Sequence, residues 1–352
     1  MSLSTPKTTR AAILVETGKP LEIMEIDLPE LAPGQALVKL AYAGVCHSQL
    51  NEVRGLKGAD KLLPHTLGHE GSGTVIAVGP GTVKVKAGDR VVLTWIKGSG
   101  KDVPSVTYTS QKFPKINSGA ISTFMEYTLV CENRLCVIPD TMPLREAALL
   151  GCALPTGGGM VMNEGKVKEG SSVAVFGCGG IGSCAVAVAS MLGADPLIAI
   201  DQVPDRLALA KSLGATHVIY AAEEDAAKRI QEICPGGVSL ALEATGVPAV
   251  MEIAHASVRA GGGLCLLAGN VPFGKKISID PFDLIKGKNI AGSWGGATDP
   301  DRDIPRYVEM ILKDELNLAN MMSGYRLEDI NQALDDMEAG RALRPVISFE
   351  DA

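Results

Sequence analysis

The chain has 352 residues and a formal net charge of −7 at pH 7. One hydrophobic core rarely serves a chain of this length, so two domains are expected. The acidic balance argues against nucleic acid as a partner, because phosphate binding needs a basic face. Hydrophobic residues make up 46% and charged residues 21%, a balance that excludes a disordered chain and fits a globular enzyme.

The N-terminus and the cysteine usage predict a cytoplasmic protein. Residues 1–10 are polar and lack the apolar stretch of a secretory signal. The longest apolar stretches, such as 185–192, are too short to span a bilayer, so no membrane partner is expected. The eight cysteines are unevenly spaced and follow no secretory signal, so they do not predict a disulfide framework.

From residue 10 to about 150, short alternating apolar runs are separated by Gly and Pro turns. This texture predicts short strands in a largely antiparallel, barrel-like β domain. The clearest runs are residues 36–43, 73–78 and 90–93.

After Pro155, continuous apolar runs alternate with helical stretches. Such alternation predicts a doubly wound parallel sheet that is buried on both faces. The predicted strands are residues 172–176, 196–200, 218–220, 240–243 and 264–268, and the predicted helices are residues 181–192, 204–213, 225–234 and 248–258.

The C-terminal segment predicts two amphipathic helices, near 303–313 and 327–339, and a last strand at 345–349. We expect this tail to pack back on the first domain. The predicted organisation is therefore a discontinuous domain of residues 1–153 and 293–352, with a second domain of residues 154–292.

A glycine-rich loop opens the second domain. Residues 177–182, Gly-Cys-Gly-Gly-Ile-Gly, match the G-x-G-x-x-G pattern directly between a predicted strand and a predicted helix. Gly177 would permit the tight turn, Gly179 would let a pyrophosphate approach, and Gly182 would let helix and strand pack closely. Gly180 and Ile181 complete the candidate cofactor contacts, because the free N–H groups of a helix N-terminus favour phosphates.

An acidic residue follows at the spacing that a dinucleotide site requires. Asp201 ends the next predicted strand, 19 residues after Gly182. Its carboxylate would accept hydrogen bonds from the ribose hydroxyls and repel a 2′-phosphate, which favours NAD over NADP. Arg206 is expected to flank the adenosine ribose. Since a nearby arginine can also serve a 2′-phosphate, NADP stays the less favoured alternative.

Three potential metal ligands lie in separate segments of the first domain. Cys46 follows the predicted strand 36–43, His69 comes 23 residues later, and Cys152 precedes the second domain. Taken singly, such residues are more often part of a core. Together, two thiols and one imidazole match an open catalytic zinc site, whose fourth position is left for water or substrate.

These motifs, taken together, resemble those of the zinc-containing medium-chain alcohol dehydrogenases over essentially the whole chain. The resemblance implies an α/β protein with a GroES-like β-barrel catalytic domain and a Rossmann domain. It implies reversible hydride transfer between a primary or secondary alcohol, or a polyol, and NAD, in a homodimer or homotetramer. The matching pieces are residues 44–48 (GVCHS), 68–71 (GHEG), 88–91 (GDRV), 151–157 (GCALPTG), 175–182 (VFGCGGIG) and Asp201.

The resemblance also assigns roles to residues at the metal. Cys46, His69 and Cys152 would bind the catalytic zinc, a Lewis acid toward an alcohol or carbonyl oxygen. Glu70 would lie behind the metal and ligate it transiently. Ser48 would hydrogen-bond the reacting oxygen and begin the proton relay.

Other positions resemble cofactor and substrate contacts of the family. Thr156 would pack at the nicotinamide, and His47 and Arg344 would contact the cofactor phosphates. Trp95 and Phe124 would line the substrate pocket, with plain core packing as the alternative for Trp95.

The chain departs from the family pattern at three places. Many members have a histidine at position 51, but Asn51 cannot titrate, so the proton route beyond Ser48 stays open. Gln49 stands where an acidic residue is common, and a neutral side chain is expected to weaken metal binding. Residues 92–128 contain no cysteine, so a four-cysteine structural zinc lobe cannot form there, and one zinc per subunit is expected.

Two alternatives stay open on the sequence alone. A zinc-free quinone or enoyl reductase of the same fold would lack metal ligands, and the Cys46, His69 and Cys152 trio counts against it. A non-redox enzyme or a regulatory protein that retains NAD would share the fold, and Asn51 keeps that possibility open.

Overall fold

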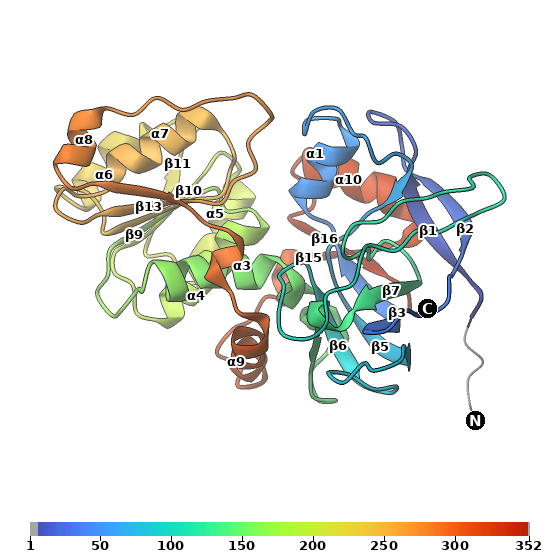
Figure 1. Cartoon of the computed structure of the whole chain (residues 1–352). Helices are drawn as coiled ribbons and strands as arrows, with labels where there is room; N and C mark the ends of the chain where they lie inside the picture. Colours follow the sequence, from blue (N-terminus) through green and yellow to red (C-terminus); the bar gives the residue numbers. More distant parts are fainter. Residues whose placement is uncertain (1–5, 351–352) are drawn as a thin grey trace. The chain divides into compact units, whose positions relative to one another are not determined.

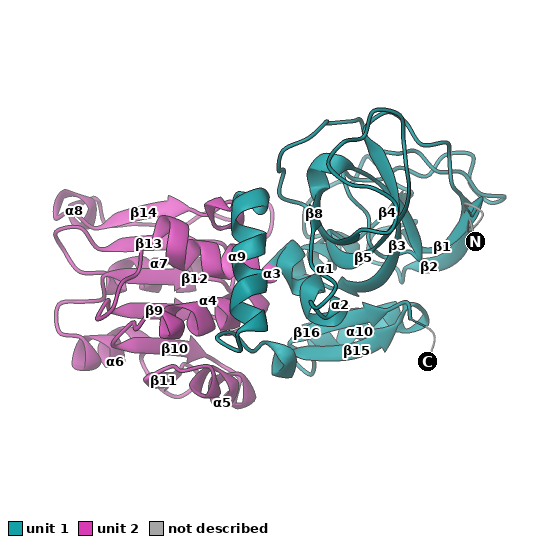
Figure 2. Cartoon of the chain, turned by 90° about the horizontal axis from the view of Figure 1, so that it is seen from below, with its two compact units in different colours: residues 1–152, 299–352 teal, residues 153–298 magenta. Residues whose placement is uncertain are grey.

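The structure is a computed structural model that describes residues 6–350 (Figure 1). The chain forms two compact units (Figure 2). Unit 1 comprises Met1–Cys152 and Asp299–Ala352, and unit 2 comprises Ala153–Thr298. The predicted second domain, residues 154–292, lies within unit 2, which extends to Thr298.

Unit 1 contains a seven-stranded and a three-stranded sheet among its described residues. Its strands are β1 (Thr8–Leu14), β2 (Glu22–Asp27), β3 (Gln35–Gly44), β4 (His65–Thr66), β5 (Glu70–Val78), β6 (Arg90–Thr94), β7 (Tyr127–Cys131), β8 (Leu135–Val137), β15 (Met322–Arg326) and β16 (Arg344–Ser348). The larger sheet runs β15-β16-β3-β5-β6-β8, with β7 paired to β3, and the smaller runs β2-β1-β4. All of these pairs except β15-β16 are antiparallel, which confirms the predicted β domain.

Strand β3 is the centre of unit 1. It pairs with β5, β7 and β16, and nearly all of its side chains are buried, Leu37 and Leu40 among them. Burying each such leucine contributes about 1.5–3 kcal/mol. Because β16 comes from the chain's last segment and pairs with β3, the tail joins unit 1, in line with the expected packing of the C-terminal segment.

The helices of unit 1 are α1 (His47–Val53), α2 (Leu144–Ala147), α9 (Pro300–Leu312) and α10 (Ile330–Glu338). Helix α9 begins earlier than the sequence predicted, because Asp299 caps it by accepting a hydrogen bond from the Asp301 N–H at 3.1 Å and Pro300 fits its first turn. Asp303 is 1% exposed and accepts from the Asp299 N–H at 3.0 Å. Residues 299–303 therefore form the start of helix α9.

Unit 2 is a six-stranded parallel sheet with helices on both faces, which confirms the doubly wound prediction (Figure 1). The strand order is β11-β10-β9-β12-β13-β14. The strands are β9 (Val173–Phe176), β10 (Leu197–Asp201), β11 (His217–Tyr220), β12 (Leu240–Glu243), β13 (Leu264–Leu267) and β14 (Asn289–Gly292). The helices are α3 (Ala153–Gly159), α4 (Gly180–Met191), α5 (Pro204–Ser212), α6 (Ala226–Ile233), α7 (Pro248–Ser257) and α8 (Pro281–Ile285).

The strand order of unit 2 reverses between β9 and β12. In open parallel sheets, ligands bind beyond the carboxyl ends of the strands at such a reversal. The glycine loop follows the carboxyl end of β9 and therefore lies where a ligand is expected. Among the described residues, no helix has the length and apolar character that crossing a bilayer requires.

Candidate metal centre and dinucleotide site

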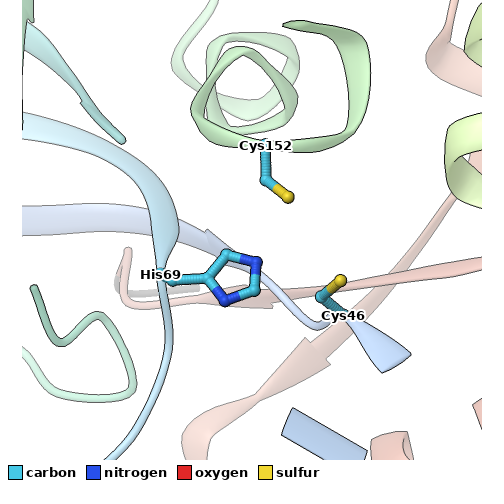
Figure 3. A group of neighbouring side chains, drawn as sticks. All are labelled: Cys46, His69 and Cys152. Carbon is cyan, nitrogen blue, oxygen red and sulfur yellow. The ribbon is translucent and has the colours of Figure 1, made fainter. Parts of the chain in front are cut away.

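The three predicted metal ligands converge in unit 1, with their side chains pointing toward one another (Figure 3). Cys46 lies between β3 and α1, His69 directly precedes β5, and Cys152 follows the short helical segment Ala148–Gly151. Their ligand atoms all lie within 4.8 Å of one another. Three segments that are distant in the sequence thus bring two sulfurs and one nitrogen to one point.

These residues fit a zinc ion by their chemistry as well as their spacing. Both thiols are buried, and a hydrogen bond between them holds the pKa of Cys46 well below its usual range and that of Cys152 well above it. The Nε2 atom of His69 is buried and has no hydrogen-bond partner among the described residues. A divalent cation would bind both sulfurs as thiolates in place of the hydrogen bond between them. It would also accept the lone pair of His69 Nε2.

A buried ion pair lies behind the thiols. Glu70 opens β5 and is 0% exposed, and Arg344 opens β16 and is 2% exposed. Their side chains form a short ion pair. Burial alone would lower the pKa of Arg344, but the combined effect of Glu70 and the two thiols is larger and raises it above its usual value. The guanidinium therefore stays charged. Arg344 therefore balances the charge of Glu70 and places a positive charge beside Cys46 and Cys152.

Two glycines that sequence reasoning passed over make room for Glu70. A Cβ on Gly44 would lie 1.8 Å from Glu70 Oε1, and a Cβ on Gly151 would lie 2.6 Å from Glu70 Cβ. Both glycines belong to the sequence motifs GVCHS and GCALPTG. Only the folded chain shows that the lack of a side chain at these two positions leaves space for Glu70.

Gln49 contacts the candidate metal ligand His69 from α1. Its side-chain amide lies against His69 Nδ1, and its Nε2 lies 3.5 Å from Ser48 Oγ. Within residues 6–350, its buried Oε1 has no hydrogen-bond partner. A half-turn of the amide brings Oε1 to Nδ1, which can then donate its proton to Oε1. That arrangement fixes the tautomer in which Nε2 offers its lone pair to a metal.

Replacing Gln49 with glutamate is expected to slow zinc release at least about 10-fold, because a carboxylate makes the His69 imidazole a more basic ligand. The measurement is the rate of zinc transfer to a chromogenic chelator. Gln35→Glu is the matched control, since Gln35 is also buried in unit 1 but its Oε1 accepts from the Ala32 N–H at 2.9 Å. Release as fast as in the unmodified protein would contradict the role of Gln49.

The remaining predicted residues of unit 1 differ in exposure. Ser48 is half-buried on α1, and His47 is exposed at its first position. The Trp95 ring lies 6.4 Å from the His69 ring, edge-on at 64°. Phe124 is 0% exposed within a hydrophobic core cluster. This burial corrects the expectation for Phe124, because a side chain that lines an open pocket keeps part of its surface accessible.

The glycine loop of unit 2 has the geometry of a dinucleotide turn. Gly177 has a φ of 87°, a conformation that favours glycine. A Cβ on Gly182 would lie 1.8 Å from the Gly177 carbonyl oxygen, whereas one on Gly179 would meet nothing within 4 Å. Gly182 thus permits helix–strand packing, and Gly179 leaves space for a ligand at the start of α4, where Gly180 and Ile181 form the first turn.

Asp201 lies beside this loop, at the end of β10. Its Oδ2 accepts from the Cys178 N–H at 2.7 Å and its Oδ1 from the Val203 N–H at 2.9 Å. Arg206 Nη1 lies 3.9 Å from Oδ2. The carboxylate is thereby fixed in position, with lone pairs left for ribose hydroxyls.

Two buried polar residues of unit 2, Thr156 and Glu243, lie outside the glycine loop. Thr156 lies on α3, and in the part of the chain that the structure describes its buried Oγ1 has no hydrogen-bond partner. Glu243, which sequence reasoning missed, is fully buried at the end of β12 and accepts from the N–H groups of Thr245 at 2.7 Å and Gly246 at 2.9 Å. Burial raises the pKa of Glu243. It holds Thr245 against Gly177, where a Cβ would lie 2.6 Å from Thr245 Cγ2.

Known families and proteins match both units. Residues 32–140 match the family model described as Alcohol dehydrogenase GroES-like domain, and residues 180–313 match Zinc-binding dehydrogenase. Two relatives named S-(hydroxymethyl)glutathione dehydrogenase, from Synechocystis sp. and Photobacterium damsela subsp. piscicida, are each 35% identical over 97% of this chain and 100% of their own length.

Solved structures agree with this similarity. The alcohol dehydrogenase zinc-binding domain protein from Burkholderia ambifaria is 33% identical, with a TM-score of 0.91 over 98% of this chain and 99% of its own. Benzyl alcohol dehydrogenase from Acinetobacter calcoaceticus is 29% identical, with a TM-score of 0.89 over 98% of this chain and 100% of its own. The similarity therefore spans essentially the whole chain.

Proposed function

We infer from the preceding comparisons and geometry that this chain, which belongs to the zinc-dependent medium-chain alcohol dehydrogenase family, oxidises alcohols to aldehydes or ketones with a nicotinamide cofactor. The convergence of Cys46, His69 and Cys152 carries this conclusion, because it offers a three-ligand open zinc site. The same three ligands argue against the zinc-free reductase considered above.

When bound, zinc supplies a Lewis acid that lowers the pKa of a substrate hydroxyl. We propose that Cys46, His69 and Cys152 hold it, that Glu70 can replace a ligand transiently, and that Ser48 Oγ accepts the substrate's hydroxyl proton. Asn51 cannot accept that proton in turn. The proton therefore leaves through water or through the cofactor ribose.

For the cofactor, we propose NAD held by residues 177–182, with Asp201 on the adenosine ribose and Arg206 flanking it. The burial of Asp201 and its two fixed N–H donors support this orientation. We also propose Thr156 at the nicotinamide, and His47 and Arg344 at the phosphates.

Replacing Asp201 with serine is expected to lower kcat/KM for NAD about 10- to 100-fold, the equivalent of one lost charge-assisted hydrogen bond. The value for NADP should rise, because the charge that repels a 2′-phosphate is removed. Steady-state kinetics with both cofactors test this. Asp205→Ser, at an exposed position of α5, is the control. An unchanged NAD-to-NADP ratio in Asp201→Ser would contradict the assignment.

The substrate is proposed to be a primary or secondary alcohol or a polyol, with Trp95 as one wall of its pocket. The test is NADH absorbance over a panel that includes benzyl alcohol, S-(hydroxymethyl)glutathione and 2,3-butanediol. Activity with at least one class of alcohol is expected. Tightly retained NAD without NADH formation from any alcohol would instead favour a non-redox or regulatory protein.

We propose one thiolate-held zinc per chain, since residues 92–128 have no cysteine for a second such site. In this segment the Lys101 N–H instead donates a hydrogen bond to Glu132 Oε1 at 3.0 Å.

We further propose a homodimer that forms through the edge strand β14 of unit 2. Edge strands leave backbone groups unpaired, and the nearby side chains of Phe282, Ile285 and Trp294 are 55%, 76% and 81% exposed. A strand that pairs with its own copy gives a closed two-fold dimer.

Light scattering should give twice the chain mass for the unmodified protein and a monomer for Ile285→Lys, but a dimer for the control Val83→Lys in unit 1. A monomeric unmodified protein would contradict the dimer.

A further inference from the structure

A second group of metal-ligating side chains lies in unit 1, apart from the thiols. Glu52 comes from α1, Asp60 from the loop that follows it, and His65 from β4, and their ligand atoms lie within 4.8 Å of one another. We call these three residues the acid–histidine cluster. His65 is 5% exposed, and its Nε2 lies 2.8 Å from Asp60 Oδ2 and 3.8 Å from Glu52 Oε1.

A contact outside the cluster determines which ring nitrogen of His65 carries a proton. Its Nδ1 lies 3.0 Å from the Thr66 carbonyl oxygen, which can only accept, so Nδ1 carries a proton. In the neutral ring, Nε2 is then a lone pair, and it faces two carboxylates that are also acceptors. Positive charge at this point, from a metal ion or from a second proton on the ring, would satisfy all three ligand atoms, and the 2.8 Å separation of Nε2 from Asp60 Oδ2 suits either. A carbonyl that fixes the other ring nitrogen is also the usual support of a metal-bound histidine.

The other contacts of the cluster leave one oxygen of each carboxylate available. Asp60 Oδ1 accepts from the Leu62 N–H at 2.8 Å, and Glu52 Oε2 lies 3.0 Å from Lys57 Nζ. Burial would raise the pKa of Asp60, but the Leu62 N–H and His65 lower it, so the carboxylate is ionised at neutral pH. Lys57 is paired with Glu52 alone, so among these contacts only His65 reaches both carboxylates.

We propose that the acid–histidine cluster is a divalent metal site, held by His65 Nε2, Asp60 Oδ2 and Glu52 Oε1. Metal–nitrogen and metal–oxygen bonds near 2.1 Å at a tetrahedral angle separate two ligand atoms by about 3.4 Å. The observed separations of 2.8 and 3.8 Å lie on either side of that value. One nitrogen and two carboxylate oxygens suit Zn²⁺ or Mn²⁺, with water in the remaining positions.

This site differs from the thiolate site in position and in strength. It has no sulfur ligand and its carboxylates are partly exposed, so its metal is exchangeable, unlike the zinc counted above. It joins α1, which starts just after Cys46, to β4, which ends three residues before His69. A metal here would therefore brace the two segments that carry catalytic ligands.

The test is calorimetric titration of Zn²⁺ into protein whose thiolate site already holds its zinc and from which loosely bound metal has been dialysed. One further equivalent per chain is expected to bind. His65→Gln should weaken that binding at least about 10-fold. His217→Gln, at an exposed histidine in unit 2, should leave it unchanged. Should His65→Gln not fold, Glu52→Gln removes a ligand while keeping the Nδ1 contact, and the same loss is expected.

Two results would overturn the proposal. One is a titration with no further equivalent, which would mean that a protonated His65 ring is the cation between the carboxylates. The other is a further equivalent that both His65→Gln and Glu52→Gln retain, which would place the metal elsewhere. The catalytic zinc content, measured in each variant, keeps this site separate from the thiolate site.

Discussion

Replacing Cys46 with alanine is expected to lower kcat/KM for alcohol oxidation at least about 1,000-fold, because a Lewis acid contributes several kcal/mol to such a reaction. The variant should also lose its tightly bound zinc, since two ligands remain where three converge. Steady-state kinetics and elemental analysis on the same preparation test both statements.

Cys136→Ala is the matched control for Cys46→Ala. Cys136 is also buried in unit 1, on β8, but it takes no part in the metal group. It should keep both its zinc and its activity. Full activity in Cys46→Ala, with zinc retained, would contradict the assigned metal site.

Replacing Glu132 with alanine is expected to lower the free energy of unfolding by roughly 3–5 kcal/mol, because a buried charged acceptor is lost and three N–H groups lose their partner. Glu132 is 0% exposed. Its Oε2 accepts from Val83 N–H at 2.8 Å and Lys84 N–H at 2.9 Å, and its Oε1 accepts from Lys101 N–H at 3.0 Å. One carboxylate thus fixes two loops, one of which, at Lys101, lies in the cysteine-free segment 92–128.

The pH dependence of this effect has a definite sign. Burial would raise the pKa of Glu132, but the N–H donors of Lys84, Lys101 and Val83 lower it below its ordinary value of 4.5. A lowered folded-state pKa stabilises the protein fully above about 4.5, and this contribution is lost as the pH falls toward the folded-state value. The stabilities of the unmodified protein and Glu132→Ala should therefore converge in acid.

Urea unfolding at neutral pH measures the Glu132 effect. Glu126→Ala is the control, because Glu126 is 36% exposed and its ion pair with Arg10 is long, at 3.6 Å. Its loss should cost less than about 1 kcal/mol. An equally small loss in Glu132→Ala would contradict the anchoring role.

Elements with a strong local signal were predictable from the sequence. The run 240–243 is strand β12 with the bounds expected, since four continuous apolar or buried positions fit an inner strand. The α9 start was missed because the Asp299–Pro300 signal stands within a charged stretch that resembles a loop. At this position the N-cap hydrogen bond of Asp299 starts the helix, although the charged composition is typical of a loop.

Only those residues of the site that belong to short sequence motifs could be predicted from the sequence. Cys46, His69 and Cys152 were found because each stands in a recognisable short motif, and the fold then brings them together. Glu132 and Glu243 were missed because their partners are backbone N–H groups, which leave no trace in a sequence. Phe124 was misassigned because burial depends on packing against distant residues.

The most direct test of the central claim is zinc K-edge absorption spectroscopy on protein dialysed to remove exchangeable metal. The assignment to Cys46, His69 and Cys152 predicts one zinc with two sulfur ligands near 2.3 Å and two nitrogen or oxygen ligands near 2.0–2.1 Å. A shell of four sulfurs, or one without sulfur, would contradict it.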